Sequence, residues 1–205
     1  MTSQAQTDRP DLDALFEDLA HPNPHLQTEA YLAMVKHWPD QALPRLLTLL
    51  DQPDVSLRRA AVRGLGAFGE VALQPLAEMF ERSTDGTVRA SCVKAYAQIA
   101  SNYPEQSFSE AAMAVLERAL SDESPVVSQS AVMALGQVGI QALPLLIQIC
   151  KGDNIAHVQS AAMALAEIPD PRAEACLRDV FNDPSTDPLC RQMVEASLGR
   201  LEDNR

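Results

Sequence analysis

A run of about twenty residues, Asp51–Glu70, recurs in degenerate form along the whole chain. Successive recurrences begin 30 to 39 residues apart, and positions i, i+4, i+8 and i+11 are apolar in most of them. The runs begin at Leu26, Leu57, Val88, Val127, His157 and Cys190. Position i+7 is always small, as at Ala33, Gly64 and Ser197. This period and spacing are typical of a helical repeat, in which each pair of helices packs against its neighbours.

The repeat predicts an all-α fold, an α-α superhelix of about five to six helix pairs. We expect one domain over residues 11–203, preceded by a disordered lead at residues 1–10, with a short acidic helix at 11–20 capping the stack. The expected first helices of the pairs are 24–38, 54–68, 85–102, 124–138, 154–168 and 187–203. The expected second helices are 41–51, 70–82, 108–121, 140–151 and 171–182. Hydrophobic residues make up 46% of the chain but aromatic residues only 4%, which favours close helix packing by Ala, Leu and Val over a sheet.

Turn and cap residues separate these helices. Asp, Ser or Asn precedes most first helices, where a side-chain oxygen can accept hydrogen bonds from free backbone N–H groups. Gly69 and Gly139 stand where a first helix must end and the chain reverse. The two Gln-Ala-Leu-Pro segments that begin at Gln41 and Gln141 are expected to open second helices with proline in the first turn.

One interval between repeats contains about eight extra residues, Ser101–Phe108. Insertions in repeat proteins form loops on one face, which is often the binding face. Tyr103 and Phe108 make this loop our best local candidate for a contact with a partner. The alternative is a surface loop without a binding role.

The formal net charge is −12, from 28 acidic and 16 basic residues. Nucleic-acid binding depends on Lys and Arg neutralising phosphates, so this charge argues against it, and it also disfavours anionic membranes. No apolar run approaches the roughly eighteen residues of a membrane span, and no signal-peptide pattern precedes residue 10. We expect a cytoplasmic protein.

The chain contains no pattern that assigns catalysis or metal binding. Cys92, Cys150, Cys176 and Cys190 form no CxxC pair and stand at positions that are apolar in other repeats. We therefore expect them to pack as small apolar side chains and predict no metal site and no catalytic residue. His157 interrupts an apolar column, and we expect Ile155 or Val158 to cover that position; the alternative is a pH-sensitive or ligand-facing His.

The exposed surface of the second helices remains as the predicted binding site. Second helices in such arrays usually line the concave side, which forms a groove for another protein. The candidate contact residues on these helices are Arg45, Thr48, Gln74, Glu78, Glu117, Arg118, Gln148 and Lys151. A plain solvated surface is the alternative for each of them.

The segments PDVSLRRAAVRGLGAFGEVALQPLAEMF and SPVVSQSAVMALGQVGIQALPLLIQI resemble the HEAT-like repeats of the phycobilisome lyase family. The resemblance covers roughly residues 11–203, and its matched residues belong to the repeat scaffold. It implies a HEAT-like solenoid. That family includes the paired E and F subunits that attach a linear tetrapyrrole to a cysteine of a phycobiliprotein, and also members without lyase activity.

Three functional hypotheses follow. The first is a non-catalytic adaptor or assembly factor in phycobilisome biogenesis, without an intrinsic cofactor, which holds a protein client in its groove. The second is a subunit of a heterodimeric bilin lyase, which would work with a second HEAT-repeat chain to attach phycocyanobilin to a phycobiliprotein. The third is a partner of an iron–sulfur or photosystem assembly factor. A bilin absorption band in the complex would distinguish the second from the other two.

Overall fold

The computed structural model describes residues 9–203, and the chain divides into two compact units, residues 1–102 and 103–205. Every regular element within residues 9–203 is a helix, which confirms the all-α repeat fold. Residues 1–8 of the expected lead lie outside the described part of the chain. The last two residues of that lead are held on Trp38, because the Arg9 guanidinium lies 3.2 Å from the centre of its ring and Trp38 Nε1 donates to the Pro10 carbonyl at 2.8 Å.

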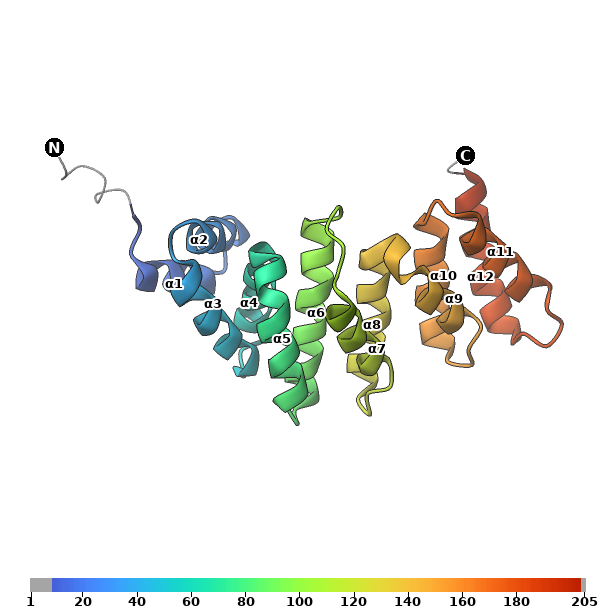
Figure 1. Ribbon diagram of the computed structural model, residues 1–205, viewed down its shortest axis with the longest axis horizontal. Helices are drawn as coiled ribbons and strands as arrows, with labels where there is room; N and C mark the ends of the chain where they lie inside the picture. The colour runs from blue at the N-terminus through green and yellow to red at the C-terminus, as the bar shows by residue number, and fades with distance from the viewer. Residues whose placement is uncertain (1–8, 204–205) are drawn as a thin grey trace. The chain divides into compact units, whose positions relative to one another are not determined.

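Unit 1 contains three first helices and two second helices behind a capping helix. Its elements are α1 (Leu12–Ala20), α2 (Pro24–His37), α3 (Pro39–Thr48), the 3-10 helix η1 (Leu49–Asp51), α4 (Val55–Phe68), α5 (Glu70–Arg82) and α6 (Gly86–Asn102). The first helices α2, α4 and α6 pack one against the next, and α1 packs on α2 and α4 (Figure 1).

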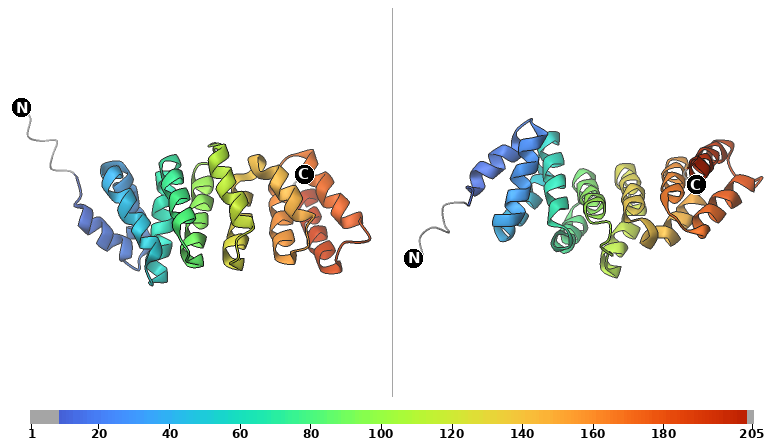
Figure 2. Two further views of the ribbon diagram at one scale, coloured as in Figure 1. Left: turned by 60° about the horizontal axis from the view of Figure 1, so that its bottom comes forward. Right: turned by 90° about the horizontal axis from the view of Figure 1, so that it is seen from above.

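Unit 2 repeats this arrangement. Its elements are α7 (Glu110–Leu120), α8 (Pro125–Val138), η2 (Gly139–Ala142), α9 (Leu143–Cys150), α10 (Ile155–Glu167), α11 (Pro171–Asn182) and α12 (Pro188–Asp203). The first helices α8, α10 and α12 form one layer of this unit and the second helices α7, α9 and α11 the other (Figure 2). The observed bounds of both units agree with the predicted ones to within three residues.

The apolar columns of the repeat form the core. The residues at position i+4 are at most 1% exposed and are Ala30, Ala61, Cys92, Ala131, Ala161 and Val194. Small side chains are required between the helices because neighbouring helices approach closely there. A Cβ atom on Gly64 would lie 3.3 Å from Leu46 Cδ2, and one on Gly66 would clash with the side chain of Gln98. In the fifth repeat Val158, 1% exposed, takes the buried place beside His157.

The loops before the first helices are fastened by the helices themselves. Asp54 accepts a hydrogen bond from the Leu57 amide at 2.9 Å, which caps α4 as predicted. Arg58, one residue after Leu57, donates to the carbonyls of Gln52 and Pro53 at 2.6 and 2.9 Å. The same contact recurs at Gln27 with His21, at Arg89 with Ser83 and at Arg191 with Asp183. In these four repeats the residue after position i therefore ties the preceding loop to its helix.

Most turn residues behave as predicted, but Ser124 precedes α8 without a capping hydrogen bond from its side chain. Gly69 and Gly139 adopt φ values of 63° and 72°, a region that disfavours residues with a Cβ. Pro144 lies in the first turn of α9, as expected. The prediction for Pro44 is wrong, because α3 begins at Pro39 and places Pro44 inside the helix. Trp38 ends α2 and begins α3 without an intervening loop, so the second helix starts two residues earlier than we inferred.

One stretch, Pro125–Cys150, is long and apolar enough to cross a membrane by length and composition alone. It comprises α8, η2 and α9 and reverses direction at Gly139, where φ is positive. Buried residues make up 44% of its most apolar window, as expected of helices that pack in a core. We therefore assign its buried apolar residues to packing within unit 2, whereas Val126, Met133 and Ile140 are exposed.

Candidate functional site

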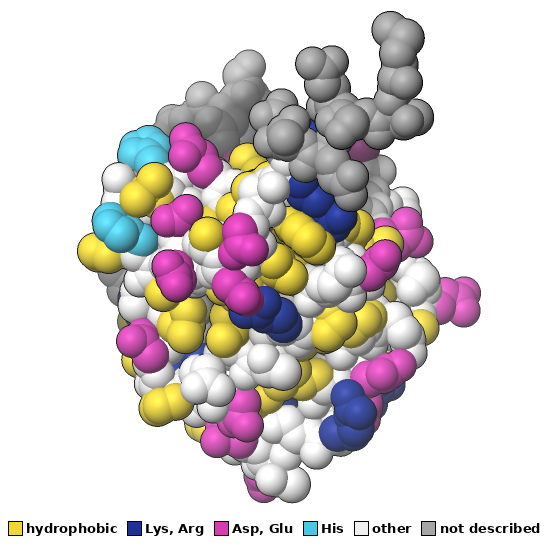
Figure 3. All heavy atoms as spheres, turned by 90° about the vertical axis from the view of Figure 1, so that its left-hand side faces the viewer, with side chains coloured by type: hydrophobic (Ala, Val, Ile, Leu, Met, Phe, Trp, Pro, Cys, Tyr) yellow, Lys and Arg dark blue, Asp and Glu magenta, His cyan; other side chains and the backbone are white. Residues whose placement is uncertain are grey.

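In unit 1 the predicted contact residues lie on the exposed side of α3 and α5. Arg45 Nη1 bonds Asp13 Oδ1 at 2.7 Å, and its guanidinium lies 3.9 Å from the centre of the Phe16 ring, so this side chain fastens α3 to α1. Thr48 Oγ1 donates to the Arg45 carbonyl at 2.7 Å. The α1 end of the unit presents many Asp and Glu side chains and few Lys and Arg, with apolar side chains between them (Figure 3).

The two predicted residues of α5 interact within that helix. Gln74 Nε2 donates to Glu78 Oε1 at 3.2 Å, and both side chains are exposed. The structure therefore brings together Arg45 with Thr48 and Gln74 with Glu78, each pair on one helix. All four residues remain on the surface that second helices present, as the repeat register predicts.

In unit 2 the predicted residues are also exposed. Glu117 and Arg118 are neighbours on α7, whereas Gln148 lies near the end of α9. Lys151 directly follows α9, and its Nζ lies 3.3 Å from Asp179 Oδ2 of α11. Lys151 thus links two neighbouring second helices at the surface, whereas Glu117 and Arg118 lie together on α7 and Gln148 lies on α9.

The two aromatic residues of the inserted loop have opposite environments. Tyr103 is 40% exposed, whereas Phe108 is 3% exposed and belongs to the core of unit 2. The Phe108 amide donates to Gln141 Oε1 at 2.8 Å, and Gln141 Nε2 donates to the Phe108 carbonyl at 2.6 Å. The buried Phe108 side chain therefore anchors the loop, and Tyr103 is the aromatic residue of the loop that reaches the surface.

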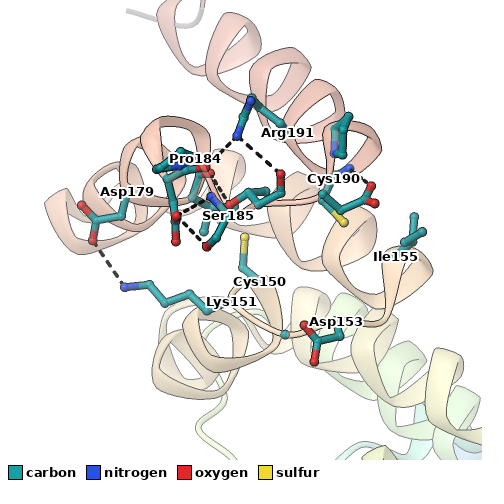
Figure 4. Close-up of a pocket in the computed structure, with 15 residues that line it drawn as sticks. Cys150, Lys151, Asp153, Ile155, Asp179, Pro184, Ser185, Cys190 and Arg191 are labelled. Atoms are coloured by element: carbon teal, nitrogen blue, oxygen red, sulfur yellow. Dashed lines mark hydrogen bonds and ion pairs between the residues drawn. The ribbon is translucent and has the colours of Figure 1, made fainter.

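Unit 2 also contains a cavity of about 780 Å³ that the sequence did not predict. It lies between the end of α9, the loop from α11 to α12 and the start of α12, and the Cys150 and Cys190 side chains point into it (Figure 4). Asp179, Ser185 and Arg191 line it as well. The Nε atom of Arg191 is buried and has no hydrogen-bond partner in the described part of the chain, although the Nη2 atom donates to the Asp183 carbonyl at 2.7 Å.

Three of the four cysteines gather beside this cavity. All four are buried and free. The hydrogen bond between the Cys150 and Cys176 thiols, and then burial, raise the pKa of Cys150, while burial and then the carboxylates of Asp187 and Asp153 raise the pKa of Cys190. The thiols of Cys150 and Cys190 are therefore protonated at neutral pH and are poor nucleophiles. Sequence reasoning placed these cysteines in separate repeats and gave no signal that they meet.

Cys92 and His157 lie outside this cavity, and burial shifts the pKa of each side chain. Burial raises the pKa of Cys92 to about 12, so this thiol packs as an apolar group. Burial also lowers the pKa of His157 from its ordinary value. Within residues 9–203 no three His, Cys, Asp or Glu side chains form a group that could hold a metal ion.

Comparison with known proteins identifies the relatives of this chain. A family model described as HEAT repeats matches residues 12–97 and 109–204. The bilin biosynthesis protein CpeZ of Synechococcus sp. (strain WH8020) is 46% identical over 180 residues, which cover 85% of this chain and 97% of the relative. The uncharacterized phycocyanin operon protein Z of Pseudanabaena tenuis (strain PCC 7409) is 34% identical over 192 residues, or 93% of this chain and 95% of the relative.

Solved structures share the fold at low sequence identity. The X-ray structure of YIBA_ECOLI matches with a TM-score of 0.57 and 17% identity, covering 95% of this chain and 74% of that chain. The complex of CpcE and CpcF of phycocyanin lyase from Nostoc sp. PCC7120 matches with a TM-score of 0.46 and 19% identity, covering 97% and 80%. At these identities the structural likeness concerns the fold alone.

Proposed function

Because this chain belongs to the HEAT-repeat family that includes the bilin biosynthesis protein CpeZ, we propose that it is a protein-binding adaptor or assembly factor for bilin-carrying photosynthetic proteins. It acts in the cytoplasm and holds a protein client, such as a phycobiliprotein or a second HEAT-repeat chain. The chain itself contributes a recognition surface and no catalytic group.

The observation that carries this proposal is the relationship to CpeZ, which extends over 97% of that relative and is not confined to one repeat. A match of this extent includes the exposed residues of the helices as well as the buried columns. Exposed rows of side chains on stacked helices form extended surfaces that suit another protein. The second helices offer such rows in each unit, from Arg45 to Glu78 in unit 1 and from Glu117 to Lys151 in unit 2.

The experiment that tests the function is affinity capture of the tagged protein from native lysate of a bilin-producing cell. The eluate is analysed by mass spectrometry and by visible absorption spectroscopy. We expect a stoichiometric phycobiliprotein subunit or assembly protein in the eluate. Capture of no protein at near-stoichiometric amount would contradict the adaptor function.

The same eluate separates the alternatives. A phycobiliprotein together with a second HEAT-repeat chain and a bound phycocyanobilin band would favour a role as a bilin lyase subunit. A colourless eluate with an iron–sulfur carrier or a photosystem assembly intermediate would favour the third hypothesis. In either case the chain binds a protein, and the identity of the captured client distinguishes the two alternatives.

A further inference from the structure

In unit 1 the basic residues concentrate on first helices and the acidic residues on second helices. The first helices α4 and α6 carry the five basic residues Arg58, Arg59, Arg63, Arg89 and Lys94 and no acidic residue. The second-helix layer, α3 with η1 and α5, carries the five acidic residues Asp40, Asp51, Glu70, Glu78 and Glu81 and only two arginines. A cationic layer is unexpected in a chain whose formal net charge is −12.

Part of this positive charge serves the fold. Arg58 and Arg89 are half-buried and donate to loop carbonyls, at 2.6 Å to Gln52 and at 3.2 Å to Ser83. Arg63 is half-buried and bonds the side chain of Gln27 on α2. These three arginines therefore have a structural role, and their presence does not by itself require a partner protein.

The other basic side chains have no such role. Arg59 of α4, Lys94 of α6 and Lys36 of α2 are exposed, and none of them forms an ion pair or a side-chain hydrogen bond within residues 9–203. Because the local fold does not use them, their charge is available to a partner.

The repeat register places these side chains together. Leu32, Arg63 and Lys94 occupy position i+6 of three successive repeats, on helices that pack one against the next. Arg59 precedes Arg63 by one turn and Lys36 follows Leu32 by one turn, so all five share one face. Leu32 is 53% exposed and gives this face an apolar contact, and the exposed acidic residue Glu29 precedes it by three positions on α2.

We propose that this cationic face, made of Leu32, Lys36, Arg59, Arg63 and Lys94, docks an acidic surface of the protein client. The inference rests on the proposed adaptor function and assigns part of the contact to the first helices, in addition to the second helices. Charge complementarity accelerates encounter and selects the partner, while each exposed ion pair adds little to the affinity.

A protein partner fits this face better than a nucleic acid. Nucleic-acid binding draws its affinity from many Lys and Arg contacts to phosphates, and about four cations on a chain of net charge −12 supply too few. The exposed Leu32 within the cationic face also suits a mixed acidic and apolar protein surface.

The test uses a fluorescein-labelled peptide of Glu, Leu and Ala as the acidic probe, with binding followed by anisotropy at about 50 and 300 mM salt. The variants are Arg59→Glu and Lys94→Glu, and the matched control is Arg82→Glu on the opposite layer. We expect each reversal on the cationic face to weaken binding roughly three- to tenfold, with the control unchanged and affinity falling with salt. Equal binding by all three variants would overturn the proposal. Far-UV circular dichroism verifies that each variant folds.

Four further outcomes identify a wrong occupant or a wrong function. Competition by a single-stranded oligonucleotide as strong as that by the peptide would assign the face to nucleic acid and overturn the proposal. A dimer in light scattering that Arg59→Glu dissociates would assign it to a second copy, with the same consequence. If native capture retains its client with both variants, the docking face is wrong and the adaptor function stands. If capture yields no client while the variants lose the peptide, the adaptor function fails and the cationic face stands.

Discussion

Gln141 satisfies both backbone polar groups of Phe108, accepting from its amide at 2.8 Å and donating to its carbonyl at 2.6 Å. The two residues are 33 positions apart, and the contact joins the inserted loop to η2, the 3-10 helix that precedes α9. The loop is therefore held at its end by one amide side chain and by the buried ring of Phe108.

Replacing Gln141 by Ala removes both hydrogen bonds at once. We expect a loss of about 1–2 kcal/mol in the free energy of unfolding, because the part-buried N–H and C=O of Phe108 lose their partner. Urea unfolding followed by circular dichroism measures the change. Gln41→Ala is the matched control, since Gln41 begins the same Gln-Ala-Leu-Pro segment and its side chain makes no such contact within residues 9–203. Equal losses in both variants would show that the loop contact contributes nothing.

The two aromatic residues of the loop should differ sharply in their effect on stability. Phe108→Ala is expected to cost about 3–4 kcal/mol because it empties a buried site, whereas Tyr103→Ala should change stability by less than about 0.5 kcal/mol. In client capture we expect the opposite order. Tyr103→Ala should reduce the amount of client captured more than Phe108→Ala does, because of these two rings only that of Tyr103 lies at the surface. Client binding unaffected by Tyr103→Ala would remove the loop from the contact surface.

Gly66 and Gly199 are both helical glycines with opposite surroundings. A Cβ at Gly66 would lie 2.8 Å from Gln98 Cβ, so Gly66→Ala should destabilise unit 1 by about 1–2 kcal/mol despite the better helix propensity of Ala. Among residues 9–203 no neighbouring atom lies within 4 Å of a Cβ at Gly199, so Gly199→Ala should stabilise by about 0.5–1 kcal/mol. Thermal unfolding of both variants checks the prediction, and a gain in Tm for Gly66→Ala would contradict the close approach of α4 and α6.

The cap of α11 should be sensitive to acid. Hydrogen bonds from the Arg172 side chain, and then from its backbone N–H, lower the pKa of Asp170 to about 2 from the usual 3.8. Since the folded state holds this carboxyl ionised, its contribution is present above pH 3.8 and is lost as the pH falls through about 2. The stability difference between the native protein and Asp170→Asn should therefore shrink over that interval. Urea midpoints measured across the interval test this, and a constant difference would show that charge plays no part.

Arg118 tests the second-helix surface in unit 2. Arg118 is exposed on α7, so Arg118→Glu should leave the unfolding transition within about 0.5 kcal/mol of the native value. If α7 contributes to the client contact, the amount of client captured falls. Unchanged capture would exclude Arg118 from the contact and would leave the rest of that layer to be tested separately.

The resemblance drawn from the repeat residues is confirmed by the HEAT-repeat match and by the relationship to CpeZ. The sequence predicted function only at the level of the family. The buried columns that carry the resemblance determine the repeat fold, and they do not specify what the surface binds. Exposed residues such as Gln148 contribute little to folding, so no local rule distinguishes a contact residue from solvated surface.

The sequence by itself determined the helices, their bounds and their buried columns. Positions such as Ala61 and Leu65 recur at helical spacing because each repeat must bury the same face against its neighbours, and this constraint is local and periodic. The caps at Asp54 and Asn154 follow from the same local chemistry, since a backbone N–H within three residues is the partner of each.

Only the tertiary structure decided which side chains meet across repeats. The contact of Phe108 with Gln141 and the closeness of Cys150 to Cys176 depend on how the chain folds back in three dimensions. Repeat periodicity assigns a residue to a face, but it does not specify the small shifts and rotations between neighbouring helices. Those shifts determine whether two side chains 26 or 33 residues apart touch.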